Sequence, residues 1–449
     1  YREKGNYVNA LKQYELAEEI FKTSEPIQPL YLAIVCHNMA LTCFHTCDYS
    51  TALDFYHLSL NMKRTIHDLD PLDLAASYSG ISSVLETFGR YDEALANTEQ
   101  SFQIRSAILP KLHPDLIINH NQFGLIYMGL GNLNKALKHY EKALEIQQLT
   151  LPENHKTLVT LNSNLSSLCG DLGNYDMALE KMERAIDIQL QLGLEAREVD
   201  TITMYSNYGL IWAEKLQYDK ALEQYQLALD LVNQNQPLIN HSAHAELRLK
   251  IGQIHAQKTN YDEALNCFNQ AIDIYNKILS SRNHQDFVHC YVPIADVYQD
   301  KNDYEKSLEY YKLTLDCFRN SSSAEDTVLA TIYANIGVLY ENMRNTPAAL
   351  YYNEKALEIL LKLSTDDAVR PDLVPIYVNL AGVYSIDKNP LEALKYSEKA
   401  LETALKCLST DHPLVDKCMK LVGKLRKEQE EQAATAAARL KSNPICPIL

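Results

Sequence analysis

The chain has 449 residues, of which 46% are hydrophobic and 22% are charged, and its formal net charge at pH 7 is −16. Nucleic-acid surfaces need clustered lysines and arginines, and no basic stripe recurs here, so we expect no nucleic-acid partner. No run of the sequence approaches the roughly 18 apolar residues of a membrane-spanning helix, and no signal peptide is recognisable. We therefore expect a cytoplasmic protein without a transmembrane segment.

A motif of the form Tyr-x-x-Ala-Leu, or a close variant, recurs ten times at intervals of 42 to 44 residues. The copies begin at Tyr7, Tyr49, Tyr91, Leu133, Tyr175, Tyr218, Tyr261, Tyr304, Thr346 and Pro390. We call the first residue of each copy position 0 and number the rest of the repeat from it. A repeat of this length holds one supersecondary unit that buries its apolar face only by stacking on its neighbours. The sequence therefore predicts an all-α solenoid.

Each repeat has two stretches of helical periodicity, which we call helix A and helix B. Helix B begins at position 0, where apolar residues recur three or four apart, as from Leu133 to Leu144. Helix A precedes it and carries a small residue at position −9, namely Ala40, Ser82, Gly124, Ser166, Gly209, Gly252, Ala295, Gly337 and Ala381. Glycine inside a helix costs roughly 1 kcal/mol relative to alanine, so its recurrence implies close approach of two helices. We expect the partner to be the helix B alanine of the same repeat.

The repeats define the domain organisation. Residues 1–23 are predicted to hold helix B of a partial first repeat, since YREKGNY reads as the last turn of a helix A whose start is missing. Residues 24–410 should form nine helix pairs, and residues 411–440 a capping helix that continues into a projecting part. Residues 441–449 are expected to be a flexible tail. The capping side chains are Leu414, Cys418, Leu421, Val422 and Leu425.

These features resemble the tetratricopeptide repeat over residues 1 to about 410. The repeat length of about 42 residues is similar to that of the kinesin light chain branch, as are the His-containing segments that lead into helix A. These segments are His113-Pro114-Asp115, Asn154-His155, Asn283-His284 and Asp411-His412-Pro413. The resemblance implies stacked antiparallel helix pairs in a right-handed superhelix, with a concave groove that binds peptides. No segment resembles the coiled coil that binds a kinesin heavy chain.

Positions −15, −12, −11 and −8 of helix A share one face, opposite the core stripe. Position −11 is occupied by Asn38, Gly80, Gln122, Asn164, Asn207, Lys250, Pro293, Asn335 and Asn379. Five of these nine are asparagine, whose carboxamide donates and accepts hydrogen bonds and so can pair with the main chain of an extended peptide. Asparagine is a mediocre helix former, which favours a binding role over a merely solvated helix face.

We assign peptide binding to residues of this stripe. They are Asn38, Gln122, Thr160, Ser163, Asn164, Ser167, Thr203, Ser206, Asn207, Lys250, Asn335 and Asn379. Lys250 and Pro293 interrupt the asparagine ladder, and a proline inside a helix removes a hydrogen bond. We therefore expect two sub-grooves, one at Asn164 and Asn207 and one at Asn335 and Asn379, with a bend near the eighth repeat.

Cysteine and histidine spacing was considered as a source of metal sites. Cys36, Cys43 and Cys47 with His37 and His45 form the densest cluster, and His241 and His244 with Glu246 form another. Neither cluster has the ligand spacing of a zinc site, so core thiols on a helix in a reducing compartment are the preferred interpretation, and we expect no metal or other cofactor.

Catalytic motifs are also missing from the sequence, so the chain is not expected to be an enzyme. Three functions remain open. The first is a scaffold that binds peptide segments of cargo or adaptor proteins, and the second is a regulatory or substrate-recruiting arm of a larger enzyme whose catalytic domain precedes Tyr1. The third is a structural spacer. A further hypothesis concerns Cys446, because the last four residues resemble a prenylation box that would give weak membrane association.

Overall fold

We describe a computed structural model of the chain, which covers residues 7–23, 29–46, 48–193, 199–234, 241–278, 285–318, 326–363, 370–407 and 412–442. Within these ranges the secondary structure consists of twenty α-helices and a short 3₁₀ helix, and it includes no strand. The described residues fall into two compact units, Tyr1–Leu238 and Ile239–Leu449, here called the N-terminal and C-terminal units. The division lies before α12.

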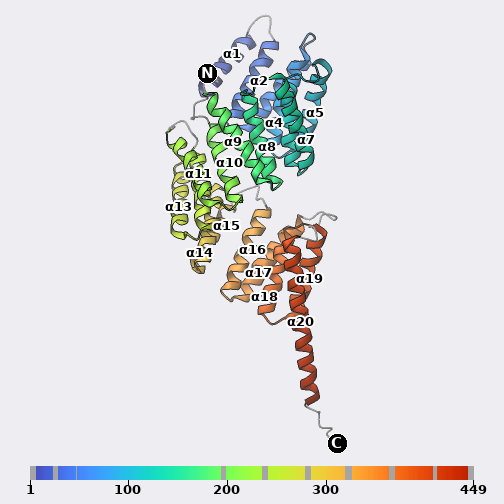
Figure 1. Ribbon diagram of the computed structural model, residues 1–449, viewed down its shortest axis with the longest axis vertical. Coiled ribbons are helices and arrows are strands. Elements are labelled where there is room, and N and C mark those ends of the chain that lie inside the picture. Colours follow the sequence, from blue (N-terminus) through green and yellow to red (C-terminus); the bar gives the residue numbers. More distant parts are fainter. Residues whose placement is uncertain are drawn as a thin grey trace. The chain divides into compact units, whose positions relative to one another are not determined.

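The N-terminal unit contains eleven helices in its described part (Figure 1). They are α1 (Tyr7–Thr23), α2 (Pro29–His45), α3 (Tyr49–Arg64), α4 (Pro71–Thr87), α5 (Tyr91–Ile108), α6 (Leu116–Gly129), α7 (Leu133–Thr150), α8 (Lys156–Asp171), α9 (Tyr175–Gln191), α10 (Val199–Glu214) and α11 (Tyr218–Gln234).

The C-terminal unit contains nine α-helices in its described part. They are α12 (His241–Gln257), α13 (Tyr261–Ile278), α14 (Val288–Asp300), α15 (Tyr304–Phe318), α16 (Asp326–Asn342), α17 (Thr346–Lys362), α18 (Leu373–Ile386), α19 (Pro390–Cys407) and α20 (Pro413–Ser442). The 3₁₀ helix, Gln285–Phe287, leads into α14, which continues through Pro293.

From α2 to α19, each even-numbered helix packs against the odd-numbered helix that follows it, so these are the predicted helices A and B. Helices A of adjacent repeats also contact one another, as α6 does with α4 and α8, whereas helices B of adjacent repeats contact one another less. Helices A therefore line the inner face of each unit. The predicted all-α solenoid of stacked helix pairs is confirmed.

The small residue at position −9 makes room for a large side chain from helix B. A Cβ atom added to Gly124 would lie 2.5 Å from Cε1 of Tyr140, and one added to Gly252 would lie 2.6 Å from Cε1 of Phe268. These rings belong to position +7, not to the alanine we expected. The alanine is nevertheless adjacent, because the Ser166 hydroxyl at position −9 donates to the carbonyl oxygen of Ala178 at 2.6 Å. The expectation of close helix approach was right, but its partner was wrong.

Two residues after the end of helix A, at position −2, lies a residue with left-handed backbone conformation. Three of these residues are glycines, Gly89, Gly131 and Gly173, with φ of 70°, 72° and 74°. The other five repeats for which this conformation is recorded use L-residues with φ between 57° and 60°, namely Leu216, Thr259, Asn302, Arg344 and Lys388. In each case the next residue donates its N–H to a carbonyl five positions back, as Asn132 does to Tyr127 at 2.8 Å. This Schellman closure starts the turn into helix B.

The His-containing segments that lead into helix A have a local structural role. His155 Nδ1 accepts a hydrogen bond from the N–H of Thr157 at 3.3 Å, and His412 Nδ1 accepts one from Leu414 at 3.1 Å. His113 makes the same contact with the N–H of Asp115 at 3.2 Å. An N–H group at the start of a helix has no partner within the helix, so these imidazoles satisfy it. Asn283 and His284 lie outside the described residues.

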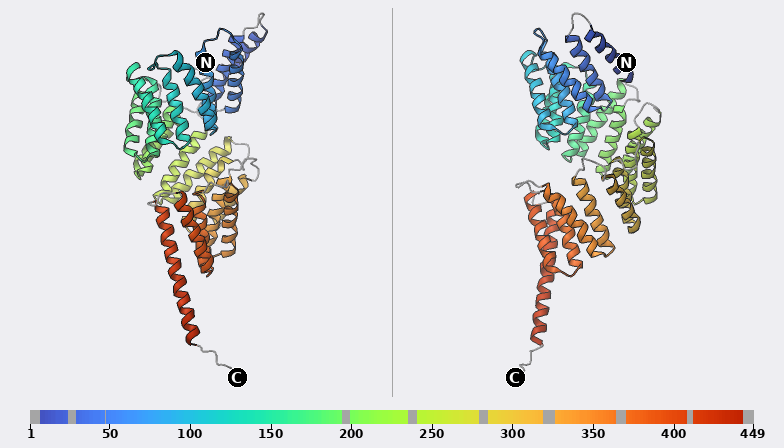
Figure 2. Two further views of the ribbon diagram at one scale, coloured as in Figure 1. Left: turned by 90° about the vertical axis from the view of Figure 1, so that its right-hand side faces the viewer. Right: turned by 180° about the vertical axis from the view of Figure 1, so that it is seen from behind.

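Helix α20 packs on α19 and then extends beyond it (Figure 2). Its first half buries Val415, Cys418, Val422 and Leu425 against the last repeat, and Leu414 packs on the same cluster. Arg426 and Glu398 add an ion pair of 2.7 Å. The helix runs to Ser442, and we keep the proposal that its first half caps the solenoid.

Candidate functional site

The predicted stripe of helix A faces away from the core. In α8, Thr160 and Ser167 are exposed and Ser163 and Asn164 are half-buried, whereas the core stripe of the same helix is buried. In α10, Thr203 is exposed, Asn207 is half-buried and Ser206 is buried. Helices α8 and α10 contact each other in the N-terminal unit, so their two stripes together form one polar, uncharged surface on its inner face.

Some carboxamides at position −11 hydrogen-bond to the preceding repeat. Gln122 is only 8% exposed, and its Nε2 donates to the carbonyl oxygen of Ser79 at 2.7 Å and to Oγ of Ser83 at 3.0 Å. Asn164 Nδ2 donates to Oδ1 of Asn121 at 2.8 Å. These bonds cross from α6 to α4 and from α8 to α6, so they fix the spacing of neighbouring helices A.

In the C-terminal unit, too, a carboxamide at position −11 bonds to the preceding repeat. Asn335 hydrogen-bonds to the hydroxyl of Tyr311, and that hydroxyl donates to Asp296. Other assigned residues are also engaged: Asn38, Thr203, Ser206 and Lys250 each interact with another group of the protein. By contrast, the side chains of Asn207 and Asn379 have no hydrogen-bond partner among the described residues. Each predicted asparagine pair thus contains one amide that is already bonded and one that is not.

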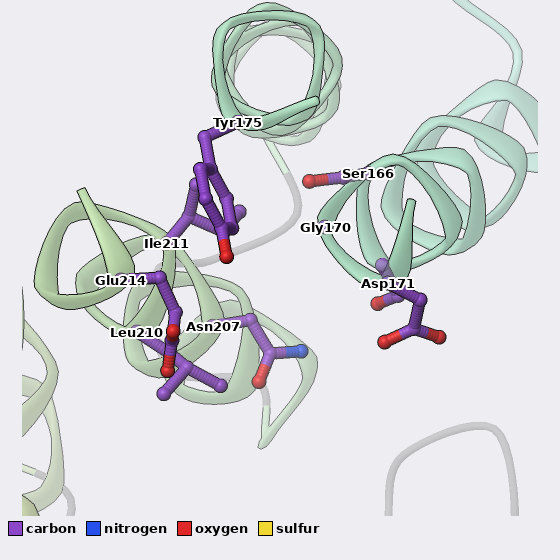
Figure 3. A pocket seen from close by; sticks show the side chains of 9 residues that line it. Ser166, Gly170, Asp171, Tyr175, Asn207, Leu210, Ile211 and Glu214 are labelled. Carbon is purple, nitrogen blue, oxygen red and sulfur yellow. The ribbon is translucent and has the colours of Figure 1, made fainter. Parts of the chain in front are cut away.

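A cavity of about 370 Å³ opens beside Asn207 on this inner face. It is lined by Ser166, Ser167, Gly170, Asp171, Tyr175, Asn207, Leu210, Ile211 and Glu214. Figure 3 shows Asn207 directed between Asp171, at the end of α8, and Glu214, at the end of α10, with the Tyr175 hydroxyl pointing in from α9. Two of the assigned residues, Ser167 and Asn207, therefore line one site.

The inner face of the C-terminal unit is different in chemistry. A cavity of about 340 Å³ there is lined by Glu246, Lys250, Gln253 and His289 among others. Burial lowers the pKa of Lys250, and nearby Glu246 opposes that shift. Further along the chain six of the twelve stripe residues are Val, Ala or Pro, namely Val292, Pro293, Ala334, Val338, Pro375 and Val378. The structure thus brings Lys250 into a charged cavity, separate from the amide surface of the N-terminal unit.

Aromatic clusters between helices A and B were only partly visible from the sequence. Tyr340 of α16 stacks on Tyr352 of α17 with centroids 5.5 Å apart, and Tyr333 lies 6.0 Å from the same ring. The repeats at α14–α15 and α18–α19 contain the same triplet of tyrosines. The recurrence of aromatic residues at positions −13, −6 and +6 is the sequence signal that reveals these triplets.

In the N-terminal unit one such cluster contains histidines. His120 of α6 and His139 of α7 occupy positions −13 and +6, with their Nδ1 atoms 3.1 Å apart, and Tyr127 stacks on His139. Burial lowers the pKa of His120 to about 4, with His139 and Lys142 contributing. Burial and the charge of Lys135 also lower the pKa of His139. Both imidazoles are therefore neutral in the folded protein at pH 7.

The thiols considered as metal ligands lie in the core. Cys36 and Cys43 are buried, and burial raises the pKa of the Cys36 thiol to about 11. Cys47 lies outside the described residues, as does the side chain of His241. Among the residues that are described, no group of three or more His, Cys, Asp or Glu side chains is arranged to hold a metal ion.

Two further sequence hypotheses concern membranes. None of the described helices has an apolar stretch long enough to cross a bilayer. Cys446, the candidate for prenylation, lies outside the described residues.

Comparisons with known proteins bear on the fold. The chain matches the tetratricopeptide repeat family over residues 31–107, 115–191, 200–277, 290–362 and 372–442. A search of curated proteins gave no match.

Solved structures with a similar fold include the apo form of RapI, which is 14% identical with a TM-score of 0.58 over 84% of this chain and 98% of that chain. The apo form of the quorum sensor NprR from B. thuringiensis is 13% identical, with a TM-score of 0.57 over 82% and 97%. Repeats of a putative kinesin light chain from Podosopora anserina are 18% identical, with a TM-score of 0.41 over 48% and 100%. Because the family match extends over most of the chain, the protein belongs to the tetratricopeptide repeat family.

Proposed function

We propose that this protein is a non-catalytic scaffold that binds extended peptide segments of partner proteins on the inner face of its N-terminal unit. The observation that carries the proposal is the carboxamide of Asn207, which has no partner among the described residues and lines an open cavity. An amide offers two donors and an acceptor, so it can pair with both the N–H and the C=O of one peptide unit without selecting a side chain.

The surroundings of Asn207 favour binding of a main chain. Ser167 lines the same cavity, and exposed Thr160 extends the uncharged polar surface along α8. Bonds from Gln122 and Asn164 to the preceding helices hold this surface in place before a ligand arrives. A preorganised surface loses less entropy on binding, so the bonded amides support the site even where they do not contact the peptide.

The partner class follows from the repeat type. Repeats of about 42 residues resemble those of kinesin light chains, so we propose cargo or adaptor proteins of the cytoplasm as the source of the peptide. The inner face of the C-terminal unit, where Asn379 has no partner among the described residues, is proposed as the second sub-groove. We expect it to bind more weakly, because valine, alanine and proline replace hydroxyl and amide groups along its stripe.

Peptide selection followed by matched substitutions tests the proposal. Ten-residue peptides displayed on phage would be selected against the full chain, and individual peptides titrated by fluorescence anisotropy. Asn207→Ala should weaken binding at least five-fold, because an unsatisfied peptide group costs about 1–3 kcal/mol. Asn97→Ala removes an amide of α5, a helix B whose Asn97 bonds only to Glu93 of the same helix, and should leave these affinities unchanged. The proposal fails if no peptide is selected or if Asn207→Ala binds like the wild type.

A further inference from the structure

We infer that the cavity between α8 and α10 is a specificity pocket for a basic side chain, Lys or Arg, of the bound peptide. The inference rests on the proposed function and adds to it the chemistry of the partner. Three features point to a cation: a carboxylate at each of two helix ends, an apolar wall with an aromatic ring, and the scarcity of Lys and Arg on the helices A of this unit.

The carboxylates occupy equivalent positions in adjacent repeats. Asp171 is the last residue of α8 and Glu214 is the last residue of α10, and both line the cavity. Both are exposed, and neither has an ion-pair partner among the described residues. A helix C-terminus carries the negative end of the helix dipole and favours a cation. Two helix ends, each with a carboxylate, therefore lie on opposite sides of the space beside Asn207 (Figure 3).

The walls of the cavity suit the stem of a long basic side chain. Leu210 and Ile211 of α10 and the ring of Tyr175 line it. Lysine and arginine pack their methylene groups on apolar surface while the charged group stays near water, and a cation is also attracted to the face of an aromatic ring. Gly170 adds space, because a Cβ atom there would meet nothing within 4 Å.

The helices A of the N-terminal unit carry few cations. Among α2, α4, α6, α8 and α10 there is one Lys or Arg, Lys156, at the first residue of α8. Among the side chains that the structure describes, the same helices carry four acidic residues, Asp73, Glu86, Asp171 and Glu214. The inner face therefore attracts basic segments and repels acidic ones before contact, and the pocket provides a defined place for the charge.

A positional peptide library tests this inference. Pools of ten-residue peptides would share one fixed central residue, either Lys, Arg, Leu or Glu, with the other positions random. Each pool would be titrated against the full-length wild type and against Asp171→Asn combined with Glu214→Gln. We expect the Lys and Arg pools to bind about ten-fold more tightly than the Leu pool, as a charge-assisted contact allows. This preference should disappear in the double variant.

Two further variants separate the pocket from general effects. Glu180→Gln combined with Asp187→Asn makes the same charge change in a cavity on α9 and should keep the preference. Gly170→Leu should fill the pocket, because open space surrounds that Cβ position, and should abolish the preference without lowering the melting temperature.

The outcomes distinguish this inference from the proposed function. If peptides bind and depend on Asn207 but show no preference for Lys or Arg, the basic pocket is wrong and the peptide surface stands. A preference that survives in the Asp171 and Glu214 double variant would also contradict the pocket. If no pool binds, the proposed function fails and this inference fails with it.

Discussion

The two units are built from the same repeat, yet they differ at the positions that face the groove and at those that close the turns. In the N-terminal unit, α8 and α10 present amides and hydroxyls, and the turns at Gly89, Gly131 and Gly173 use glycine. In the C-terminal unit apolar and charged residues occupy most of the stripe, the recorded turns use L-residues, and tyrosine triplets join helix A to helix B. The residues at packing positions such as −9 are small in both units. The groove can therefore change its chemistry without changing the fold.

The largest predicted effect concerns the end of the C-terminal unit. Deleting residues 411–449 removes the four buried side chains of α20 and exposes the face of α19. Burial of such side chains stabilises by roughly 5 kcal/mol or more in total, so we expect a lower melting temperature and self-association through the exposed edge. Size-exclusion chromatography with light scattering measures the second effect.

A shorter deletion, of residues 432–449, keeps the four buried side chains of α20 and serves as the control. It should remain monomeric, with the melting temperature of the full chain. A chain lacking residues 411–449 that stays monomeric and melts normally would show that α20 is not a cap.

The next prediction tests whether position −9 is equally tight in both units. Gly124→Ala forces a methyl group against the buried ring of Tyr140 and should cost about 2 kcal/mol of unfolding free energy. Gly337→Ala meets the side-chain amide of Asn353, which can rotate, so its cost should be smaller. Gly170→Ala meets nothing and should stabilise by about 1 kcal/mol. If thermal unfolding shows that Gly170→Ala loses as much unfolding free energy as Gly124→Ala, the packing argument is wrong.

The histidine cluster should make the N-terminal unit sensitive to acid. An unfolded His120 takes up a proton near pH 6.5, whereas in the folded chain its pKa is about 4. The unfolded state therefore binds more protons in that window, and the unfolding free energy should fall as the pH drops from 6.5 towards 4. Because the site is partly exposed, we expect a loss of about 1–2 kcal/mol.

A double variant copies the tyrosine triplet of the C-terminal unit into this cluster. His120→Tyr combined with His139→Tyr places tyrosine at the positions occupied by Tyr333 and Tyr352. Thermal unfolding measured from pH 7 to pH 4.5 should then lose the part of the pH dependence that these histidines cause. An unchanged pH profile in this variant would assign the acid sensitivity to other groups.

The smallest effect concerns the turns. Leu216 and Arg344 adopt positive φ, which is unfavourable for a residue with a Cβ atom. Replacing either by glycine, as found at Gly131, should stabilise by about 0.5–1 kcal/mol. The reverse change, Gly131→Leu, should destabilise by a similar amount. If all three variants melt at the temperature of the wild type, the turn conformation is not strained.

The repeat pattern made much of the fold predictable. Helix B begins at the Tyr-x-x-Ala-Leu motif, and helix A is followed by a left-handed residue at position −2, so both signals are local in sequence. The partner of position −9 was not predictable in this way, because it depends on how helix A is rotated against helix B. The sequence therefore suggested the helix B alanine as the packing partner, whereas the structure has the ring at position +7.

The site was predictable only in part, because it too depends on how helices pack against one another. Asn164 and Asn207 look equivalent in sequence, but the partner of Asn164 is Asn121, 43 residues earlier on another helix. The pocket also depends on Gly170 and on two helix ends from different repeats. The spacing of residues showed which face of helix A is exposed, but not which of its amides are already bonded within the fold.

The most direct test is a crystal structure of the full chain with a peptide selected from the library. The account predicts that the peptide lies extended along α8 and α10, with its main chain bonded to the carboxamide of Asn207. A basic side chain should lie between Asp171 and Glu214. The account is contradicted if the peptide binds only along α16 and α18, or on the outer helices B, and the Asn207 carboxamide still has no partner.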